Sequence, residues 1–238
     1  AYYRKTLNLL LVAPLPLYAG STGSGQLNAP TLNIGSIENK GMEISLNTQN
    51  IQHKSFSWTS TLTATIGKTK ILSLNDNNAY LTGIIDNGQI SVTRTGVGGS
   101  IGTFYGYISE GVYKDGADLA NSPKAAGQTI NRRNGVWVGD IKLKDLNNDG
   151  IIDQNDQTFL GSPIPKMQFG FNNTFNYKNF DLTIFLNGNY GNKVLNYEKA
   201  KHQDPNGGTH YFSSVLDYAK LELIDPNASQ DDPNNVYV

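Results

Sequence analysis

The stretch from residue 167 to residue 177 reads Met167-Gln168-Phe169-Gly170-Phe171-Asn172-Asn173-Thr174-Phe175-Asn176-Tyr177. Apolar side chains occupy almost every second position, and small or polar residues lie between them. Successive side chains of a β-strand point to opposite faces, so this pattern predicts a strand with one apolar and one polar face. Three further runs, 41–50, 57–67 and 181–190, alternate in the same way, with Phe185 as an exception in the last.

The length of these runs favours strands that cross a membrane. Each has about 10 residues, close to the 9–11 that a tilted strand needs to span a bilayer, whereas strands of water-soluble proteins are mostly about 5–6 residues long. Short connections at 51–56 and 178–180 contrast with long polar segments at 11–32, 72–98 and from 191 onward. Short turns at one end and long loops at the other are typical of bacterial outer-membrane barrels. A soluble β-sandwich also alternates and remains an alternative.

Composition narrows the function classes. The chain has 238 residues, a net charge of -1 and no cysteine. The length allows one large or two small domains. The nearly neutral net charge argues against nucleic acid as a partner, and the absence of cysteine excludes disulfides and thiolate metal sites. No apolar stretch reaches the roughly 18 residues of a membrane helix. No signal peptide is visible, and both ends have strand-like character, so we expect a piece of a longer protein.

The predicted fold is all-β, an antiparallel segment of a transmembrane β-barrel with long extracellular loops. We expect barrel strands with extracellular loops over 1–98 and an extracellular loop subdomain over 99–166. A barrel hairpin over 167–190 and an extracellular loop leading into the next strand over 191–238 complete the expected organisation.

The segment 145–156 carries the clearest chemical motif. Its sequence Asp-Leu-Asn-Asn-Asp-Gly-Ile-Ile-Asp-Gln-Asn-Asp fits the calcium-loop pattern D-x-[DN]-x-[DN]-G. Calcium takes six to eight oxygen ligands, and alternate residues of a tight loop supply them, while Gly at the sixth position permits the turn. The expected ligands are Asp145, Asn147, Asp149, the carbonyl of Ile151, Asp153 and Asp156. Magnesium suits the loop less well, and an Asp/Asn-rich turn without an ion is the alternative.

No motif in the chain predicts catalysis. The three histidines lack zinc-binding spacing, no G-x-S-x-G elbow occurs, and the glycine-rich stretch 96–102 lacks nucleotide-binding spacing. We therefore expect no enzyme. Two other functions remain open from the residues alone: a soluble, calcium-stabilised extracellular β-domain that binds carbohydrate, and a fragment of a glycan hydrolase.

Several stretches resemble one protein family. The segment 139–153, the stretches 161–165, 169–171, 177–182 and 188–192, and upstream 2–6, 33–41 and 101–107 are similar, in the same order, to SusC-like (RagA-type) TonB-dependent outer-membrane transporters of Bacteroidetes. The resemblance covers the chain up to about residue 200.

This resemblance implies a C-terminal part of a 22-stranded barrel in the bacterial outer membrane. The family imports oligosaccharides or peptides with energy from TonB, and a SusD-like surface lipoprotein closes over the barrel as a lid. The contact with TonB would be made by an N-terminal part that this chain lacks. Aromatic residues of the expected loops could contact the substrate or the lid, or could pack the loop subdomain instead: Tyr105, Tyr107, Tyr113 and Trp137.

Overall fold

A computed structural model describes residues 1–12, 31–74, 80–85, 90–202, 212–216 and 218–238. The chain divides into two compact units, each made of two separate segments. Unit 1 consists of residues 1–104 and 161–193, and unit 2 consists of residues 105–160 and 194–238. Among the described residues, none of the helices combines the length and the apolar composition that crossing a membrane would need.

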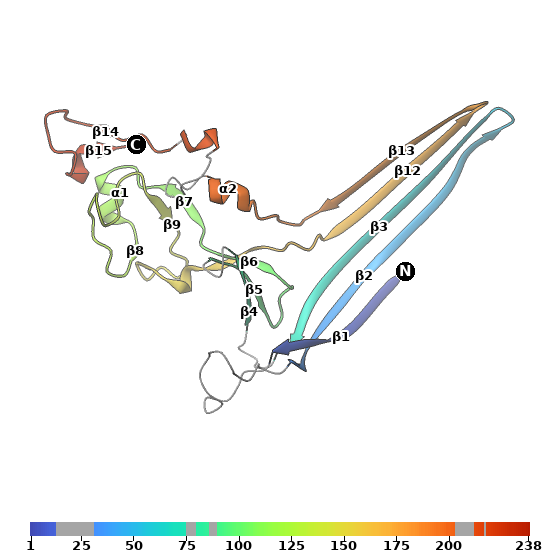
Figure 1. The fold of residues 1–238 in the computed structure, drawn as a ribbon, viewed down its shortest axis with the longest axis horizontal. Coiled ribbons are helices and arrows are strands. Elements are labelled where there is room, and N and C mark those ends of the chain that lie inside the picture. The colour runs from blue at the N-terminus through green and yellow to red at the C-terminus, as the bar shows by residue number, and fades with distance from the viewer. Residues whose placement is uncertain (13–30, 75–79, 86–89, 203–211, 217) are drawn as a thin grey trace, which may run out of the picture. The chain divides into compact units, whose positions relative to one another are not determined.

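Unit 1 is built on one long antiparallel sheet of five strands in the order β1-β2-β3-β12-β13 (Figure 1). The strands are β1 (Tyr2–Val12), β2 (Thr31–His53), β3 (Phe56–Ser73), β12 (Met167–Tyr177) and β13 (Phe180–Tyr190). All four predicted runs lie in these strands, and the predicted all-β class with antiparallel sheets is confirmed. β1 and β13 form the two edges of the sheet, which is open over the described residues.

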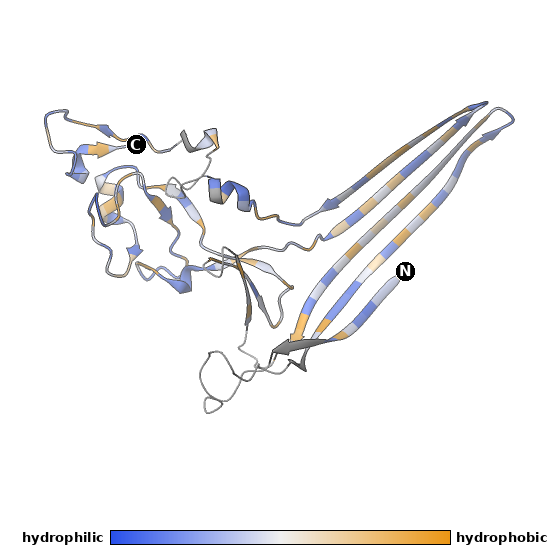
Figure 2. Cartoon of the chain, in the orientation of Figure 1, coloured by the Kyte–Doolittle hydropathy of each residue, from blue (hydrophilic) through white to orange (hydrophobic). Residues whose placement is uncertain are grey.

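The pairing of the strands places the apolar residues of neighbouring strands in the same rows. Met42 on β2, Ile66 on β3, Met167 on β12 and Tyr190 on β13 are direct neighbours in one row. Directly opposed residues share a face, so the apolar positions of these strands combine into one apolar face. The bands of alternating colour along β2, β3 and β12 follow this pattern (Figure 2).

A β-bulge keeps the two faces separate near the short turns. Gln49 pairs with Thr59 and Ile51 pairs with Trp58, which leaves Asn50 as the extra residue on β2. A bulge of this kind shifts the side-chain alternation by one residue. Ile51 therefore lies on the apolar face, next to Trp58, and the ring of Trp58 stacks on Phe175 with centroids 5.5 Å apart.

Beyond the long sheet, unit 1 contains a hairpin in the segment 72–98, where the sequence predicts a long polar loop. The hairpin consists of β4 (Tyr80–Ile85) and β5 (Ile90–Gly96), and β5 also pairs with β6 (Thr103–Gly106). The backbone of Gly98 and Gly99 bonds to Ile71 of β3. Together with the buried cluster of Ile37, Ile71 and Leu74, this contact fixes the loop to the end of the long sheet.

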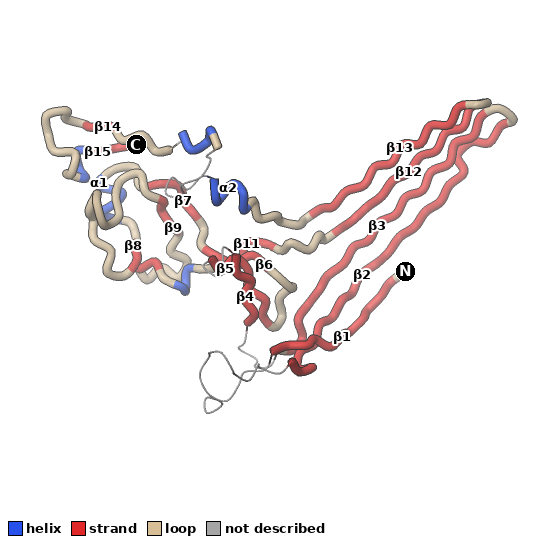
Figure 3. The backbone as a smooth tube through the Cα atoms, viewed as in Figure 1, coloured by secondary structure: helices blue, strands red, loops and turns tan. Residues whose placement is uncertain are grey.

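Unit 2 consists mainly of turns and short elements (Figure 3). Its strands form three pairs: β7 (Ser109–Val112) with β9 (Ile141–Leu143), β8 (Lys124–Ala125) with β10 (Ile151–Ile152), and β14 (Glu222–Leu223) with β15 (Val236–Tyr237). β11 (Thr158–Gly161) leads back into unit 1. The helical elements are α1 (Gly116–Asn121), α2 (Tyr197–His202) and the 3₁₀ turns η2 (Gln154–Asp156), η3 (Ser213–Leu216) and η4 (Pro233–Asn235).

Capping and a small core hold unit 2 together. Asp115 caps the start of α1 by accepting the amide of Asp118, and the Nζ of Lys124 donates to the carbonyls of Leu119 and Ser122 at the other end. These contacts satisfy backbone groups that a short helix leaves open. The buried core gathers residues from distant parts of the sequence: Tyr113, Leu119, Val136, Trp137, Val138 and Val236.

Candidate functional site

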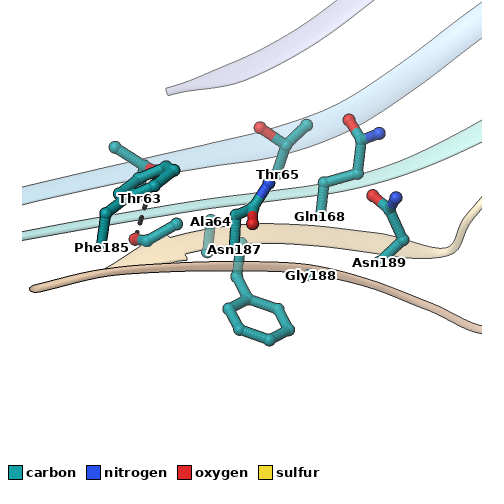
Figure 4. Close-up of a pocket in the computed structure, with 10 residues that line it drawn as sticks. Thr63, Ala64, Thr65, Gln168, Phe185, Asn187, Gly188 and Asn189 are labelled. Atoms are coloured by element: carbon teal, nitrogen blue, oxygen red, sulfur yellow. Dashed lines mark hydrogen bonds between the residues drawn. The ribbon is translucent and has the colours of Figure 1, made fainter. Parts of the chain in front are cut away.

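The polar face of the long sheet carries a shallow pocket, in which side chains from β3, β12 and β13 meet (Figure 4). Thr65, Gln168 and Asn189 form one row across these strands, and Thr63, Gly170 and Asn187 form the next. The pocket is thus lined by hydroxyl and amide groups together with apolar groups, and no charged side chain is among its lining residues. Such groups donate and accept hydrogen bonds, as the hydroxyls of a sugar or the amides of a peptide do.

Phe185 on β13 places an aromatic ring on this polar face. It is directly opposite Asn172 in the sheet, and its side chain is 64% exposed. A Cβ added to Gly170 would lie 3.7 Å from the ring of Phe185 and 3.0 Å from the Oγ1 of Thr63, so Gly170 lies next to both side chains. Sequence reasoning treated Phe185 only as an irregularity of the pattern. The register shows that it places an exposed ring among hydrogen-bonding groups, and no local motif signals that arrangement.

On the opposite face, one polar cluster interrupts the apolar rows. Asn173 is 7% exposed, and its Oδ1 accepts hydrogen bonds from the Nε1 of Trp58 at 3.1 Å and from the hydroxyl of Ser60 at 2.7 Å. Thr48 pairs with Ser60 in the same row and donates to its carbonyl. The polar atoms of this cluster thus bond to one another, as buried polar groups must if they are not to cost stability.

The predicted calcium loop is a tight turn in unit 2. The carboxylate of Asp145 accepts hydrogen bonds from the amides of Asn148 at 2.6 Å and Gly150 at 2.8 Å. Gly150 has a φ of +83° and Asn148 a φ of +59°, values that favour Gly and Asn. Asn147 and Asp149 also contact each other through the Nδ2 of Asn147 and the Oδ2 of Asp149, 2.8 Å apart.

The last predicted ligand has a different environment. Asp156 is fully buried, and its carboxylate accepts the amides of Leu146 and Asp153, both at 2.8 Å. Asp153 in turn accepts the amide of Asn155 and caps η2. The two backbone amides hold the pKa of Asp156 below its ordinary value. Asp156 therefore closes the loop on itself through its own backbone.

The geometry fits a cation only in part. Asp145, Asn147 and Asp149 bring partly or fully exposed side-chain oxygens to one turn, where they accept backbone amides, but the carboxylate of Asp156 is fully buried. Over the ranges that the structure describes, no group of three or more His, Asp or Glu side chains is arranged to hold a metal ion. The oxygens of residues 145 to 149 are thus the part of the motif that fits calcium.

An ion pair stabilises unit 2 next to its core. The Nζ of Lys142 on β9 is 2.6 Å from the Oδ1 of Asp118 on α1, and both side chains are about four-fifths buried. The hydrogen bond from Lys142 is the main reason why the pKa of Asp118 falls from 3.8 to about 2. The same bond raises the pKa of Lys142. Burial raises the pKa of the neighbouring Tyr113.

The four aromatic residues predicted to contact a substrate or lid separate into two groups. Tyr113 and Trp137 are 3% and 5% exposed and belong to the core of unit 2, and the hydroxyl of Tyr113 donates to the carbonyl of Pro123. Packing, the alternative role weighed from the sequence, accounts for these two. Tyr105 and Tyr107 are half-buried, and the ring of Tyr105 meets that of Phe159 edge to face at 5.2 Å.

The chain is similar to a set of bacterial receptors. It is 37% identical over 217 residues to TonB-dependent receptor P26 of Formosa agariphila and 34% identical over 200 residues to TonB-dependent receptor P3 of the same organism. It is also 28% identical over 199 residues to TonB-dependent receptor SusC of Bacteroides thetaiotaomicron. These matches cover 91%, 82% and 81% of the chain but only 20%, 18% and 17% of the receptors. No family model matches the chain.

Solved structures agree with this similarity at the level of fold. A structure of the RagAB peptide transporter superposes with a TM-score of 0.61 at 19% identity, over 92% of this chain and 22% of that one. The RagAB peptide importer in its open-open state superposes with a TM-score of 0.57 at 18% identity, over 87% of this chain and 20% of that one. TonB-dependent receptors are outer-membrane proteins, and the predicted location in the bacterial outer membrane is thereby confirmed. The chain is therefore homologous to the TonB-dependent receptors, SusC among them, and spans about a fifth of their length.

Proposed function

We propose that this chain is part of a TonB-dependent importer that carries oligosaccharides or peptides across the outer membrane. The observation that carries the proposal is the five-stranded sheet, which has one apolar and one polar face over strands long enough to span a bilayer. The homology to TonB-dependent receptors over most of the chain supports it. The apolar face would lie against lipid and the polar face would line the interior of the barrel.

The polar face suggests how the segment takes part in uptake. Its pocket offers hydroxyl and amide groups, and the exposed ring of Phe185 offers an apolar surface beside them. An uncharged lining that combines polar groups with aromatic rings suits neutral oligosaccharides, because sugars combine a ring of hydroxyls with apolar C–H faces. One similar structure carries the name of a peptide transporter, so peptides remain within the proposal.

The partners of the proposed importer lie outside this chain. A SusD-like surface lipoprotein would close over the extracellular side, and TonB would engage an N-terminal part of the receptor. Within the chain, Tyr105 and Tyr107 are the aromatic residues that we propose for contact with the substrate or the lid, because their rings are half-exposed, whereas those of Tyr113 and Trp137 are buried.

Growth experiments test the importer. The gene for the receptor that contains this chain is deleted, and the strain is grown on a panel of oligosaccharides and peptides as carbon sources. We expect growth to be lost on one substrate class and restored by the intact receptor, while the variant Phe185→Ala restores it only in part. The variant Phe180→Ala, which removes an exposed ring at the short turn instead, is the matched control. Equal growth of the deleted and complemented strains on every substrate would reject import.

We propose in addition that the loop 145–156 binds calcium through Asp145, Asn147, Asp149 and the carbonyl of Ile151, with Asp153 contributing through water. The motif and the tight turn at Gly150 support this assignment. Asp156 would hold the loop closed instead of binding the ion, because its carboxylate is fully buried, whereas that of Asp145 is only partly buried. A bound calcium would stiffen the extracellular loop.

Chelation tests the calcium site in the intact receptor. Calcium should slow hydrogen exchange of residues 145–156 by about tenfold relative to EGTA, because an ion that binds only the folded loop stabilises it. The variant Asp149→Ala should lose most of this protection, whereas Asp153→Asn, placed as a water-mediated ligand, should keep much of it. Identical exchange with and without calcium would exclude a functional site.

A further inference from the structure

The apolar face of the long sheet ends at a definite row. That row consists of Tyr2, Met42, Ile66, Met167 and Tyr190 on neighbouring strands. At the other end, Phe56 and Tyr177 pair next to the short turns. Ten residues along β3 separate the two rows, which is about 33 Å at roughly 3.3 Å per residue, and about 25 Å across a membrane for strands tilted by roughly 40°. This is the height of the apolar band of a transmembrane barrel.

The next row on the same face is basic. Arg4, Lys40 and Lys68 are direct neighbours across β1, β2 and β3, one pleat beyond Tyr2, Met42 and Ile66. One further pleat brings Glu38 next to Lys70. All four cations are exposed, and they lie at the end of the sheet away from the short turns.

Glu38, the acidic residue in this group, forms ion pairs with Arg4 and Lys40 and so holds these two side chains in place. Glu38 is 5% exposed, and its carboxylate lies 2.5 Å from the Nε of Arg4 and 3.8 Å from the Nζ of Lys40. Lys68 and Lys70 have no ion-pair partner among the residues that the structure describes. Four cations and one anion leave a net charge of three on a surface about one Debye length across.

We propose that Arg4, Lys40, Lys68 and Lys70 form a binding site for the phosphate groups of lipid A in the outer leaflet. This inference rests on the proposed function, which places the apolar face in lipid and the end away from the short turns on the extracellular side. The basic row then lies about 5 Å above the apolar band, at the level of the lipid head groups. Clustered cations at that level attract anionic head groups, and each contributes to the affinity.

The variant that tests the site is Lys68→Gln/Lys70→Gln, because these two side chains have no ion-pair partner within the described part of the chain whose loss would disturb the fold. The matched control is Lys5→Gln/Lys54→Gln. It removes two exposed lysines, one pairing with Asn39 on the opposite face of the sheet and one at the short turn. A third variant, Lys68→Arg/Lys70→Arg, keeps the charge.

The intact receptor is delipidated, and the binding of lipid A, dephosphorylated lipid A and phosphatidylglycerol is measured by native mass spectrometry. We expect the Gln/Gln variant to bind lipid A about thirtyfold more weakly than the wild type, the control and the Arg/Arg variant, as the loss of two head-group cations implies. Dephosphorylated lipid A should bind the wild type and the Gln/Gln variant equally.

Two results would overturn the proposal: equal lipid A binding by the Gln/Gln variant and the wild type, or binding of phosphatidylglycerol as tight as that of lipid A. Both can occur in a receptor that still supports growth on its substrate, in which case the lipid site fails and the importer stands. Absence of the receptor from the outer-membrane fraction would reject the importer and the lipid site together.

Discussion

At the scale of a single residue, Asp156 is expected to stabilise the loop 145–156 in which it lies. Its buried carboxylate accepts two backbone amides, from Leu146 and Asp153. In Asp156→Asn, the amide group can accept only one of them, and the other N–H loses its partner. A buried donor without a partner is destabilising, so we expect hydrogen exchange of residues 145–157 to become about tenfold faster.

The matched control for this substitution is Gln154→Ala, which changes an exposed residue of the same 3₁₀ turn. It should leave exchange close to that of the wild type. If Asp156→Asn exchanged no faster than Gln154→Ala, the two hydrogen bonds would contribute nothing to the loop.

The ion pair between Asp118 and Lys142 makes unit 2 sensitive to acid. Because the pKa of Asp118 is lowered on folding, from 3.8 to about 2, its stabilisation is present above about pH 4 and is lost as the pH falls toward 2. The raised pKa of Lys142 keeps the pair intact up to alkaline pH. Compared with the wild type at the same pH, Asp118→Asn should exchange its unit 2 amides about tenfold faster at pH 6 and nearly equally fast at about pH 1, below the lowered pKa. A full difference that persisted below that pKa would assign the effect to something other than this charge.

At the scale of elements, the sequence predicts the strands of the long sheet because period-two alternation is a local signal. The runs 41–50, 57–67, 167–177 and 181–190 lie in β2, β3, β12 and β13. The hairpin of β4 and β5 was missed, since its strands are short and Gly83 interrupts the first one. The bulge at Asn50 was also invisible, because a bulge is defined by the partner strand and not by the strand itself.

The polar cluster of Asn173, Trp58 and Ser60 on the apolar face should stabilise the packing of β3 against β12. Asn173→Ala leaves the Nε1 of Trp58 and the hydroxyl of Ser60 without their shared acceptor, which should destabilise the long sheet by about 1–3 kcal/mol. The measurement is the temperature at which the receptor loses its folded mobility in a detergent gel. Asn172→Ala is the control, because the neighbouring Asn172 lies on the opposite face and its buried Oδ1 has no hydrogen-bond partner. Equal shifts for both variants would assign no role to the cluster.

At the scale of the whole molecule, the sequence could not predict how unit 2 forms its core. Val236 packs with Tyr113, Leu119 and Trp137, although more than 90 residues separate Val236 from each of them in the chain. The β14–β15 pair and the contact of α1 with η4 bring these segments together. Contacts of this kind depend on tertiary packing, and they leave no period in the sequence. For the same reason, the predicted loop aromatics Tyr113 and Trp137 are buried in the structure.

The two faces of the long sheet determine whether the whole receptor is a membrane barrel or a soluble sandwich, and spin labels distinguish these possibilities. The chain contains no cysteine, so labels can be attached at Leu62→Cys and Leu186→Cys on the apolar face and at Thr61→Cys and Asn187→Cys on the polar face. In a barrel, the first pair should be accessible to oxygen, which concentrates in lipid, and the second pair to a water-soluble nickel chelate. In a sandwich, the labels at residues 62 and 186 would be shielded from both reagents, because the apolar face would be packed against protein. Opposite accessibility at neighbouring positions therefore supports the barrel, and shielding of the apolar pair would reject it.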